Sequence, residues 1–171
     1  MINYATSLKI KNIYLSDKSC ISISFIFFIL LDRVIPVCLP SRKQKKLASV
    51  GNYGTVVGWG VMRNKRASEL LKELRLPVMD YNKCVRAYNN TYNLTNSMFC
   101  AGKNTPEDTC KGDSGGGYLF RDTRKKKWTL QGVVSWGGPQ CGKPDQPSVY
   151  TKVSLFTPWI RSVMRDRKYG K

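Results

Sequence analysis

The hydrophobic pattern of the chain changes at residue 32. Residues 21–31 form an almost continuous apolar run, whereas the later residues carry short apolar segments separated by glycine, proline and polar turns. Short apolar segments with regular turn signals are typical of strands in an all-β domain. The pattern therefore predicts a β-rich domain from residue 32 and a different kind of segment before it.

The clearest strand signal is the alternation of Leu74, Leu76 and Val78 with polar residues or proline between them. This period of two indicates a half-buried strand. Further strands are predicted over residues 55–61, 98–101, 117–121, 128–136 and 149–153, with a hairpin tip over residues 122–127.

Two helices complete the predicted elements. A short helix is expected over residues 81–88, and a final helix begins near Pro158, since proline is tolerated in a first turn. In the final helix, apolar residues at positions 159, 160, 163 and 164 share a face that we expect to pack on the strands. Arg161, Arg165 and Arg167 turn toward water.

The segment of residues 1–31 has two interpretations. Its apolar run follows several lysines, as in a signal peptide, but no small-residue cleavage site separates it from Asp32. The run is also too short to cross a bilayer, which takes about 20 residues as a helix. We favour the hypothesis that this segment is translated intron. Pyrimidine-rich codons encode Phe, Leu, Ile and Ser, and a pyrimidine tract precedes a splice acceptor. Transcript reads that run continuously from residue 1 through residue 60 would contradict this hypothesis.

Composition and cysteine content indicate a secreted globular protein. The chain has 171 residues, 42% of them hydrophobic and 11% aromatic, which suits one packed domain. Six cysteines without a Cys-x-x-Cys pair favour disulfides over a metal or redox site, so no cofactor or metal is expected. Glycosylation sequons at Asn89 and Asn93 agree with an extracellular surface loop.

The formal net charge of +18 arises from 29 Lys and Arg against 11 Asp and Glu. Such a field attracts polyanions, for example heparin-like glycans or anionic membranes. Each basic run taken singly is better explained as a solvated loop or helix face. Because no nucleic-acid motif accompanies the charge, no specific nucleic-acid partner is expected.

Residues 108–116, Asp-Thr-Cys-Lys-Gly-Asp-Ser-Gly-Gly, carry the candidate chemistry. Ser114 lies in a glycine-rich turn that can present its hydroxyl together with the N–H groups of Gly112 and Ser114. Two convergent N–H donors would form an oxyanion hole for acyl transfer. Composition alone would make such a turn a plain loop, so the wider sequence has to decide.

Seven ordered motifs over residues 32–168 resemble the trypsin/chymotrypsin-like serine peptidases. Beyond the Ser114 stretch, they are Val34-Ile35-Pro36-Val37-Cys38-Leu39-Pro40, Val57-Gly58-Trp59-Gly60, Met98-Phe99-Cys100-Ala101-Gly102, Gly132-Val133-Val134-Ser135-Trp136-Gly137, Val149-Tyr150-Thr151-Lys152-Val153 and Trp159-Ile160. The later sequence Cys141-Gly142-Lys143 is most similar to the clip-domain and complement-type branch.

This resemblance implies an all-β fold: the second six-stranded barrel of a chymotrypsin-like double β-barrel, with a C-terminal α-helix. Residues 32–171 would then form a partial peptidase domain. The family pattern pairs Cys84 with Cys100 and Cys110 with Cys141. In this branch Cys38 would bond an upstream activation peptide, and Cys20 has no counterpart. Gly54 and Phe120 stand where a further family bridge has its cysteines.

The resemblance also implies a primary pocket for substrate. Asp108 would lie at its base and pair with a substrate Arg or Lys, although without the family a solvated loop acid would be the better interpretation. Gly137 and Ser148 would form its walls. Ser135, Trp136 and Gly137 would pair with the backbone of an extended peptide.

The catalytic apparatus is incomplete in this sequence. In the family a His takes the proton of the nucleophile, here Ser114, and an Asp orients that His; this chain contains no His. Activation also frees an amine that pairs with the carboxylate before the nucleophile, here Asp113, and the segment that would supply it has no counterpart. We therefore predict that this chain is inactive as written.

Two functions follow from these observations. The first is a secreted trypsin-like endopeptidase that cleaves after Arg or Lys and acts on peptide or protein substrates once completed by a first barrel. The second is a non-catalytic protease homologue that binds polyanions. A half-fold would expose an apolar face toward the missing barrel.

Overall fold

The computed structural model describes residues 37–62, 65–88, 92–122, 126–143 and 145–165, together with the short strands β1 (Ile13–Ser16) and β2 (Cys20–Ile23). Strands β1 and β2 form an antiparallel pair. The predicted boundary between residues 31 and 32, the sequon residue Asn89 and Arg167 lie outside the described residues. The second sequon residue, Asn93, is exposed.

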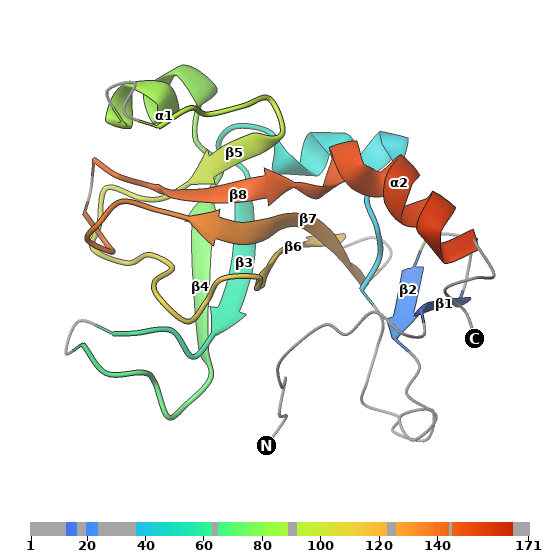
Figure 1. Cartoon of the computed structure of the whole chain (residues 1–171), viewed down its shortest axis with the longest axis horizontal. Coiled ribbons are helices and arrows are strands. Elements are labelled where there is room, and N and C mark those ends of the chain that lie inside the picture. Colours follow the sequence, from blue (N-terminus) through green and yellow to red (C-terminus); the bar gives the residue numbers. More distant parts are fainter. Residues whose placement is uncertain are drawn as a thin grey trace.

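Six antiparallel strands form the main sheet (Figure 1). They are β3 (Tyr53–Gly58), β4 (Lys72–Pro77), β5 (Met98–Ala101), β6 (Gly117–Asp122), β7 (Lys127–Trp136) and β8 (Ser148–Lys152). Their order in space is β4-β3-β6-β7-β8-β5. All five predicted strands outside the β4 region are present, with ends that differ by three residues or fewer.

The two outer strands of this sheet meet each other, which closes it into a barrel. An antiparallel bridge joins Val78, just after β4, to Ala101 in β5. The Met79 N–H donates to Cys100 O at 2.8 Å, and the Gly102 N–H donates to Pro77 O at 3.1 Å. The fold is therefore a six-stranded antiparallel barrel, as predicted.

Alternating side chains fill the inside of the barrel. Leu76 is fully buried and Leu74 half-buried, as their alternation with exposed Glu73 and Arg75 predicts. Four of the nine core residues are aromatic, and the ring centroids of Tyr118 and Tyr150 lie 4.7 Å apart. The residues of the core cluster are Val56, Leu76, Val78, Phe99, Ala101, Tyr118, Phe120, Val134 and Tyr150.

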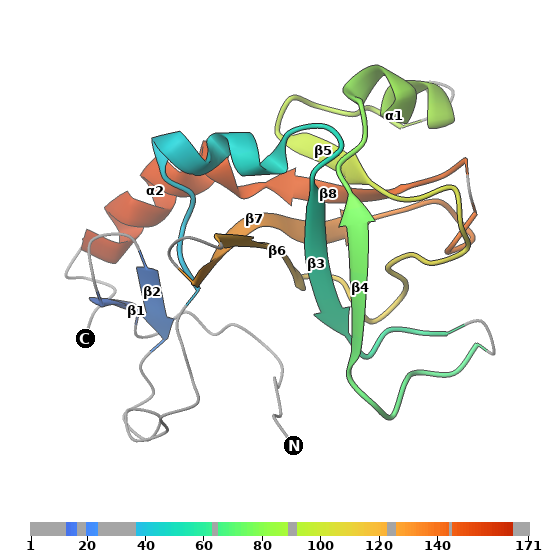
Figure 2. The same cartoon turned by 180° about the vertical axis from the view of Figure 1, so that it is seen from behind.

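Three helices lie outside the barrel. Helix α1 (Tyr81–Ala87) lies beside β5, with Asp80 as its N-cap accepting the Lys83 N–H at 3.1 Å. The 3-10 helix η1 (Arg42–Ala48) and helix α2 (Val153–Arg165) lie together at the other end of the molecule (Figures 1 and 2). The sequence analysis did not predict η1, although Ser41 and Gln44 form a capping box at its start.

The prediction for the C-terminal helix was wrong in two respects. Helix α2 begins at Val153, so Pro158 lies inside it rather than in its first turn. Of the face predicted to pack on the strands, Ile160, Val163 and Met164 are half-buried, but Trp159 is 61% exposed. The fully buried residues of the helix are instead Val153 and Thr157, in its first turns.

Two disulfides join described residues in the pairs that the resemblance implies. Cys84 is bonded to Cys100 and Cys110 to Cys141. Cys38, which we expected to lack a partner in this chain, is also disulfide-bonded. Where the family has a further bridge, the side chains of Tyr118 and Phe120 pack directly against Gly54 and leave no room for a β-carbon there.

Candidate active site

The predicted nucleophile lies in a turn between the disulfide half Cys110 and β6. Gly112 and Gly115 have φ values of +97° and +82°, a backbone conformation that favours glycine. The Asp113 N–H donates to Cys110 O at 3.0 Å, and the Gly116 N–H donates to Asp113 O at 2.9 Å. These bonds hold the turn and use neither the Gly112 nor the Ser114 N–H. The Ser114 side chain is exposed.

Asp113 points away from Ser114 and into the barrel wall. Its carboxylate accepts the Gly60 N–H at 2.9 Å and the Cys110 N–H at 3.0 Å. A β-carbon at Gly58 or Gly60 would overlap this carboxylate, so both glycines of the Val-Gly-Trp-Gly motif make room for it. Two backbone N–H groups thus hold the Asp113 carboxylate in this structure.

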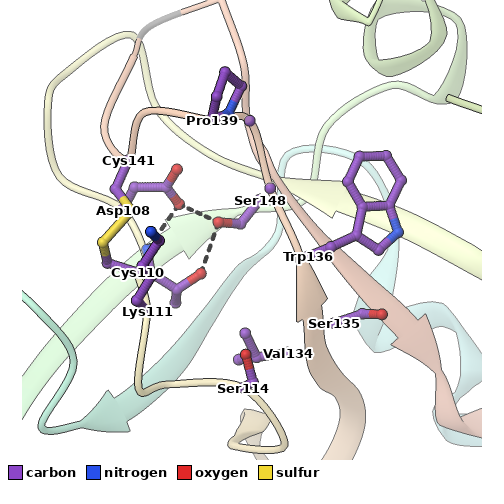
Figure 3. A pocket seen from close by; sticks show the side chains of 13 residues that line it. Asp108, Cys110, Lys111, Ser114, Val134, Ser135, Trp136, Pro139, Cys141 and Ser148 are labelled. Carbon is purple, nitrogen blue, oxygen red and sulfur yellow. Dashed lines mark hydrogen bonds between the residues drawn. A yellow bond between two sulfur atoms is a disulfide. The ribbon is translucent and has the colours of Figure 1, made fainter. Parts of the chain in front are cut away.

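A pocket of about 200 Å³ opens beside this turn. Figure 3 shows Asp108 and Ser148 facing each other within it, with Ser114 next to Val134 and with Trp136 on the flank. Its lining residues are Asp108, Thr109, Cys110, Lys111, Ser114, Val134, Ser135, Trp136, Gly137, Gly138, Pro139, Cys141 and Ser148. The predicted pocket residues are therefore brought together with the predicted nucleophile.

The carboxylate of Asp108 is held by hydrogen bonds. The Thr109 N–H donates to Asp108 Oδ1 at 2.8 Å, and the Ser148 hydroxyl donates to the same oxygen at 2.6 Å. Burial raises the pKa of the Asp108 carboxyl above its usual range, although the bonds from Ser148 and from the Thr109 and Gly142 amides counteract this effect. Within the described residues no cation forms an ion pair with Asp108.

Thr109 and Tyr150 extend this network into the core, and sequence analysis did not assign them to the site. The Thr109 hydroxyl donates to Ser148 Oγ at 2.6 Å and lies 3.5 Å from the Tyr150 hydroxyl. Only the position of Thr109 next to Asp108 could have indicated its role, because its partners lie about 40 residues further along the chain.

The remaining predicted residues lie at the rim. Gly137 is exposed, and Trp136 is half-buried with its ring centroid 4.9 Å from that of Tyr88. Exposed Ser135 follows Val134, whose N–H donates to Gly116 O at 2.8 Å and so attaches this strand to the Ser114 turn. This arrangement leaves the outer edge of residues 135–137 facing the pocket opening.

The chain combines an antiparallel six-stranded barrel with a Gly-Asp-Ser-Gly turn beside a pocket that contains Asp108. These features define the C-terminal half of a chymotrypsin-like serine peptidase domain. Comparison with known sequences agrees: the family model described as Trypsin matches residues 21–160. The chain belongs to the trypsin family of serine peptidases. The match begins at residue 21, the first residue of the apolar run, and so includes the whole of residues 21–31.

Similar curated proteins belong to the clip-domain and complement-type branch. The chain is 39% identical over 140 residues to clotting factor C of Tachypleus tridentatus, which covers 77% of this chain and 14% of that protein. It is 35% identical over 137 residues to the CLIP domain-containing serine protease HP8 of Bombyx mori, covering 79% and 37%. It is 39% identical over 134 residues to rat mannan-binding lectin serine protease 1, covering 77% and 18%. The chain therefore spans well under half the length of these relatives.

Two further findings concern cofactors and membranes. Among the described residues, no three His, Cys, Asp or Glu side chains gather in a way that could hold a metal ion. Every helix in the described part of the chain falls short of the length and hydrophobicity that a membrane span requires.

Proposed function

We propose that this chain is the substrate-recognition half of a secreted trypsin-like endopeptidase that cleaves after Arg or Lys. A substrate cation would enter the pocket and pair with Asp108, which sets the neighbouring peptide carbonyl beside Ser114. The observation that carries this proposal is the half-buried, hydrogen-bonded Asp108 in a pocket whose lining includes Ser114. A buried carboxylate without a cation is a strong binding site for one.

The same proposal holds that the isolated chain does not hydrolyse peptides. Ser114 is a weak nucleophile unless a base takes its proton, and the sequence contains no His. In addition, the Asp113 carboxylate is bonded to backbone amides rather than to an amine. The general base, its Asp partner and the activating amine would all come from a first barrel.

Binding of benzamidine to the full chain tests the recognition role. Its amidinium group is a small cation that fits a pocket with an acidic base, and calorimetry measures its Kd. Asp108→Asn should weaken binding by roughly tenfold or more, because it removes a charge-assisted bond. The matched control is Glu73→Gln, which removes a charge from an exposed position on β4. Equal binding by wild type and Asp108→Asn would contradict the pocket role.

Hydrolysis of an Arg peptide anilide tests the catalytic part of the proposal. We expect no turnover above the buffer rate, because no group accepts the Ser114 proton. Turnover that Ser114→Ala abolishes would show that another base serves the nucleophile, and it would contradict the proposed inactivity.

Polyanion binding by a non-catalytic homologue is the second candidate, and the net charge of +18 favours it. Exposed basic residues on several elements, such as Lys72, Arg86, Lys127 and Lys143, would supply the contacts. Retention on a heparin column at physiological salt supports this function, provided that Asp108→Asn elutes with the wild type. Elution near the void volume would exclude it.

A further inference from the structure

One oxygen of the Asp108 carboxylate is already saturated by the protein. Oδ1 accepts the Thr109 N–H at 2.8 Å and the Ser148 hydroxyl at 2.6 Å. A carboxylate oxygen offers two lone pairs, so these two donors use both positions on Oδ1. The Gly142 amide also bonds this carboxylate. With Oδ1 filled, a ligand in the pocket must bond Asp108 mainly through Oδ2, beside the Gly142 amide.

The direction of the Ser148 hydroxyl is fixed by a chain of donors behind it. The Thr109 hydroxyl gives its only proton to Ser148 Oγ, so the Ser148 proton must go to Asp108. The Tyr150 hydroxyl, 3.5 Å from Thr109 Oγ1, can then act only as the donor in that contact. Burial raises the pKa of Tyr150, which keeps this phenol protonated. The three hydroxyl groups thus all point their protons toward Asp108.

These three hydroxyl groups are packed in the protein and are shielded from water. Ser148 is 2% exposed and Thr109 7% exposed, while Tyr150 belongs to the closed core of the barrel. Ser148 is also fixed as the first residue of β8, where it pairs with Ala101 of β5. Water cannot replace the Ser148 hydroxyl at this position without displacing packed side chains, so Oδ1 stays occupied.

The side chains of arginine and lysine need different hydrogen-bond acceptors from such a carboxylate. A guanidinium binds best as a fork, with one N–H to each carboxylate oxygen, whereas an ammonium is a point charge with three donors that one oxygen satisfies. Ser148 Oγ donates one bond and accepts one, which leaves one lone pair for a second ammonium N–H. Oδ2 and Ser148 Oγ together suit an ammonium better than a guanidinium.

We propose that Ser148 makes the pocket select lysine over arginine. This inference rests on the proposed function, namely that Asp108 binds a substrate cation. Ser148 contributes in two ways: its proton occupies the oxygen that a guanidinium fork requires, and its hydroxyl stands close to the wall at Gly137, within 3.5 Å of where a β-carbon there would lie. Thr109 is a positioning residue, because it acts by orienting the Ser148 hydroxyl.

Two matched ligands test the selectivity in the full chain: the acetylated methylamides of lysine and of arginine. Titration followed by NMR gives Kd for each with wild type, Ser148→Ala and Asp108→Asn. Wild type should bind the lysine compound more tightly. Ser148→Ala should tighten binding of the arginine compound by roughly tenfold, because the fork becomes available, and weaken that of the lysine compound. Ser162→Ala, which removes an exposed hydroxyl on α2, is the control and should change neither value.

Thr109→Val provides a second variant in case Ser148→Ala does not fold, as judged by circular dichroism. It keeps the backbone N–H bond to Asp108 but removes the group that orients Ser148, so the preference should shift toward arginine to a smaller extent. An unchanged ratio of the two Kd values in these variants, with both ligands lost in Asp108→Asn, would overturn the selectivity and leave the proposed function intact. Absence of binding by either ligand to wild type would overturn both.

Discussion

Asp108, the proposed binding residue, also affects the stability of its own fold. Its carboxylate is desolvated and interacts with hydroxyl and amide donors, without a cation among the described residues. Such an arrangement keeps the group in place but leaves its negative charge uncompensated. The pocket is therefore ready for a cation at a cost to the empty protein.

Asp108→Asn should raise the stability of the empty chain near neutral pH. The pKa of Asp108 is raised in the folded state, so the folded protein binds the proton more tightly than the unfolded chain does. The free energy of unfolding consequently falls as the pH rises from the unfolded pKa through the folded one. Asn accepts the same hydrogen bonds without the charge. Urea unfolding at pH 7 should show the gain, and at pH 2.5 it should vanish.

The second half-buried acid, Asp113, contacts two glycines, Gly58 and Gly60, that lie more than 50 residues earlier in the chain. Gly60 both donates its N–H to the carboxylate and leaves space for it. The conformation of the Ser114 turn thus depends on a strand end that carries no chemistry of its own. This link explains the glycines of the Val-Gly-Trp-Gly motif in physical terms.

Gly60→Ala should destabilise the fold by about 1–3 kcal/mol, because its β-carbon overlaps the Asp113 carboxylate. The matched test is a double-mutant cycle with Asp113→Ala, measured by urea unfolding. In the Asp113→Ala background, Gly60→Ala should cost little, since the space is free. Additive effects of the two substitutions would show that the glycine serves another purpose.

At the level of elements, the sequence pattern was a good guide to the strands and to α1, predicted over residues 81–88 and found over Tyr81–Ala87, but a poor guide to the start of α2. Strand β4 follows the predicted alternation, with Leu76 buried and Glu73 and Arg75 exposed, because a period of two reports which side of a strand is buried. Strand β5 occupies the predicted residues 98–101. Helix α2 starts earlier than predicted because burial of Val153 and Thr157 against the barrel sets its beginning. Tertiary packing of this kind outweighs the preference of proline for a first turn.

Some residues of the candidate site could likewise be predicted from the sequence and others could not. Asp108, Ser114 and Gly137 could be predicted because each lies within a motif of contiguous residues. The roles of Thr109 and Tyr150 could not, since they depend on hydroxyl directions set by the contact of two distant segments. Residue order alone does not state which donor faces which acceptor.

The two disulfides should differ in function although they contribute similarly to stability. They close loops with sequence separations of 16 for Cys84–Cys100 and 31 for Cys110–Cys141, which corresponds to about 3–4 kcal/mol each. Only Cys110 and Cys141 line the pocket among these four. Replacing that pair with alanine should weaken benzamidine binding at least tenfold, whereas replacing the other pair should lower the melting temperature and preserve binding. Calorimetry on both variants distinguishes these outcomes.

The molecule as a whole carries several large apolar side chains in contact with solvent. On helix α2, Leu155, Phe156 and Trp159 are 50%, 40% and 61% exposed. Exposed apolar groups that gather on one element commonly mark an interaction surface. In a two-barrel peptidase this helix would have a neighbour, so the isolated chain presents a surface without one.

Trp159→Gln should reduce self-association of the chain and leave its fold intact. The side chain contributes little to the core, so the free energy of unfolding should change by less than about 0.5 kcal/mol. Sedimentation velocity at increasing protein concentration measures the association. The control is Ser162→Gln, an exposed change on the same helix. Identical association of wild type and Trp159→Gln would assign the contact to another surface.

The bridge between Val78 and Ala101 has a consequence beyond this one chain. Because the strand edges of the barrel pair with each other, separating the barrel from a neighbour uncovers side chains but breaks no continuous ladder of backbone hydrogen bonds. Recombination between genes could therefore join, duplicate or detach such a unit without exposing unpaired edge strands. The barrel is in this sense a self-contained unit, and the pocket beside Ser114 lies wholly within it.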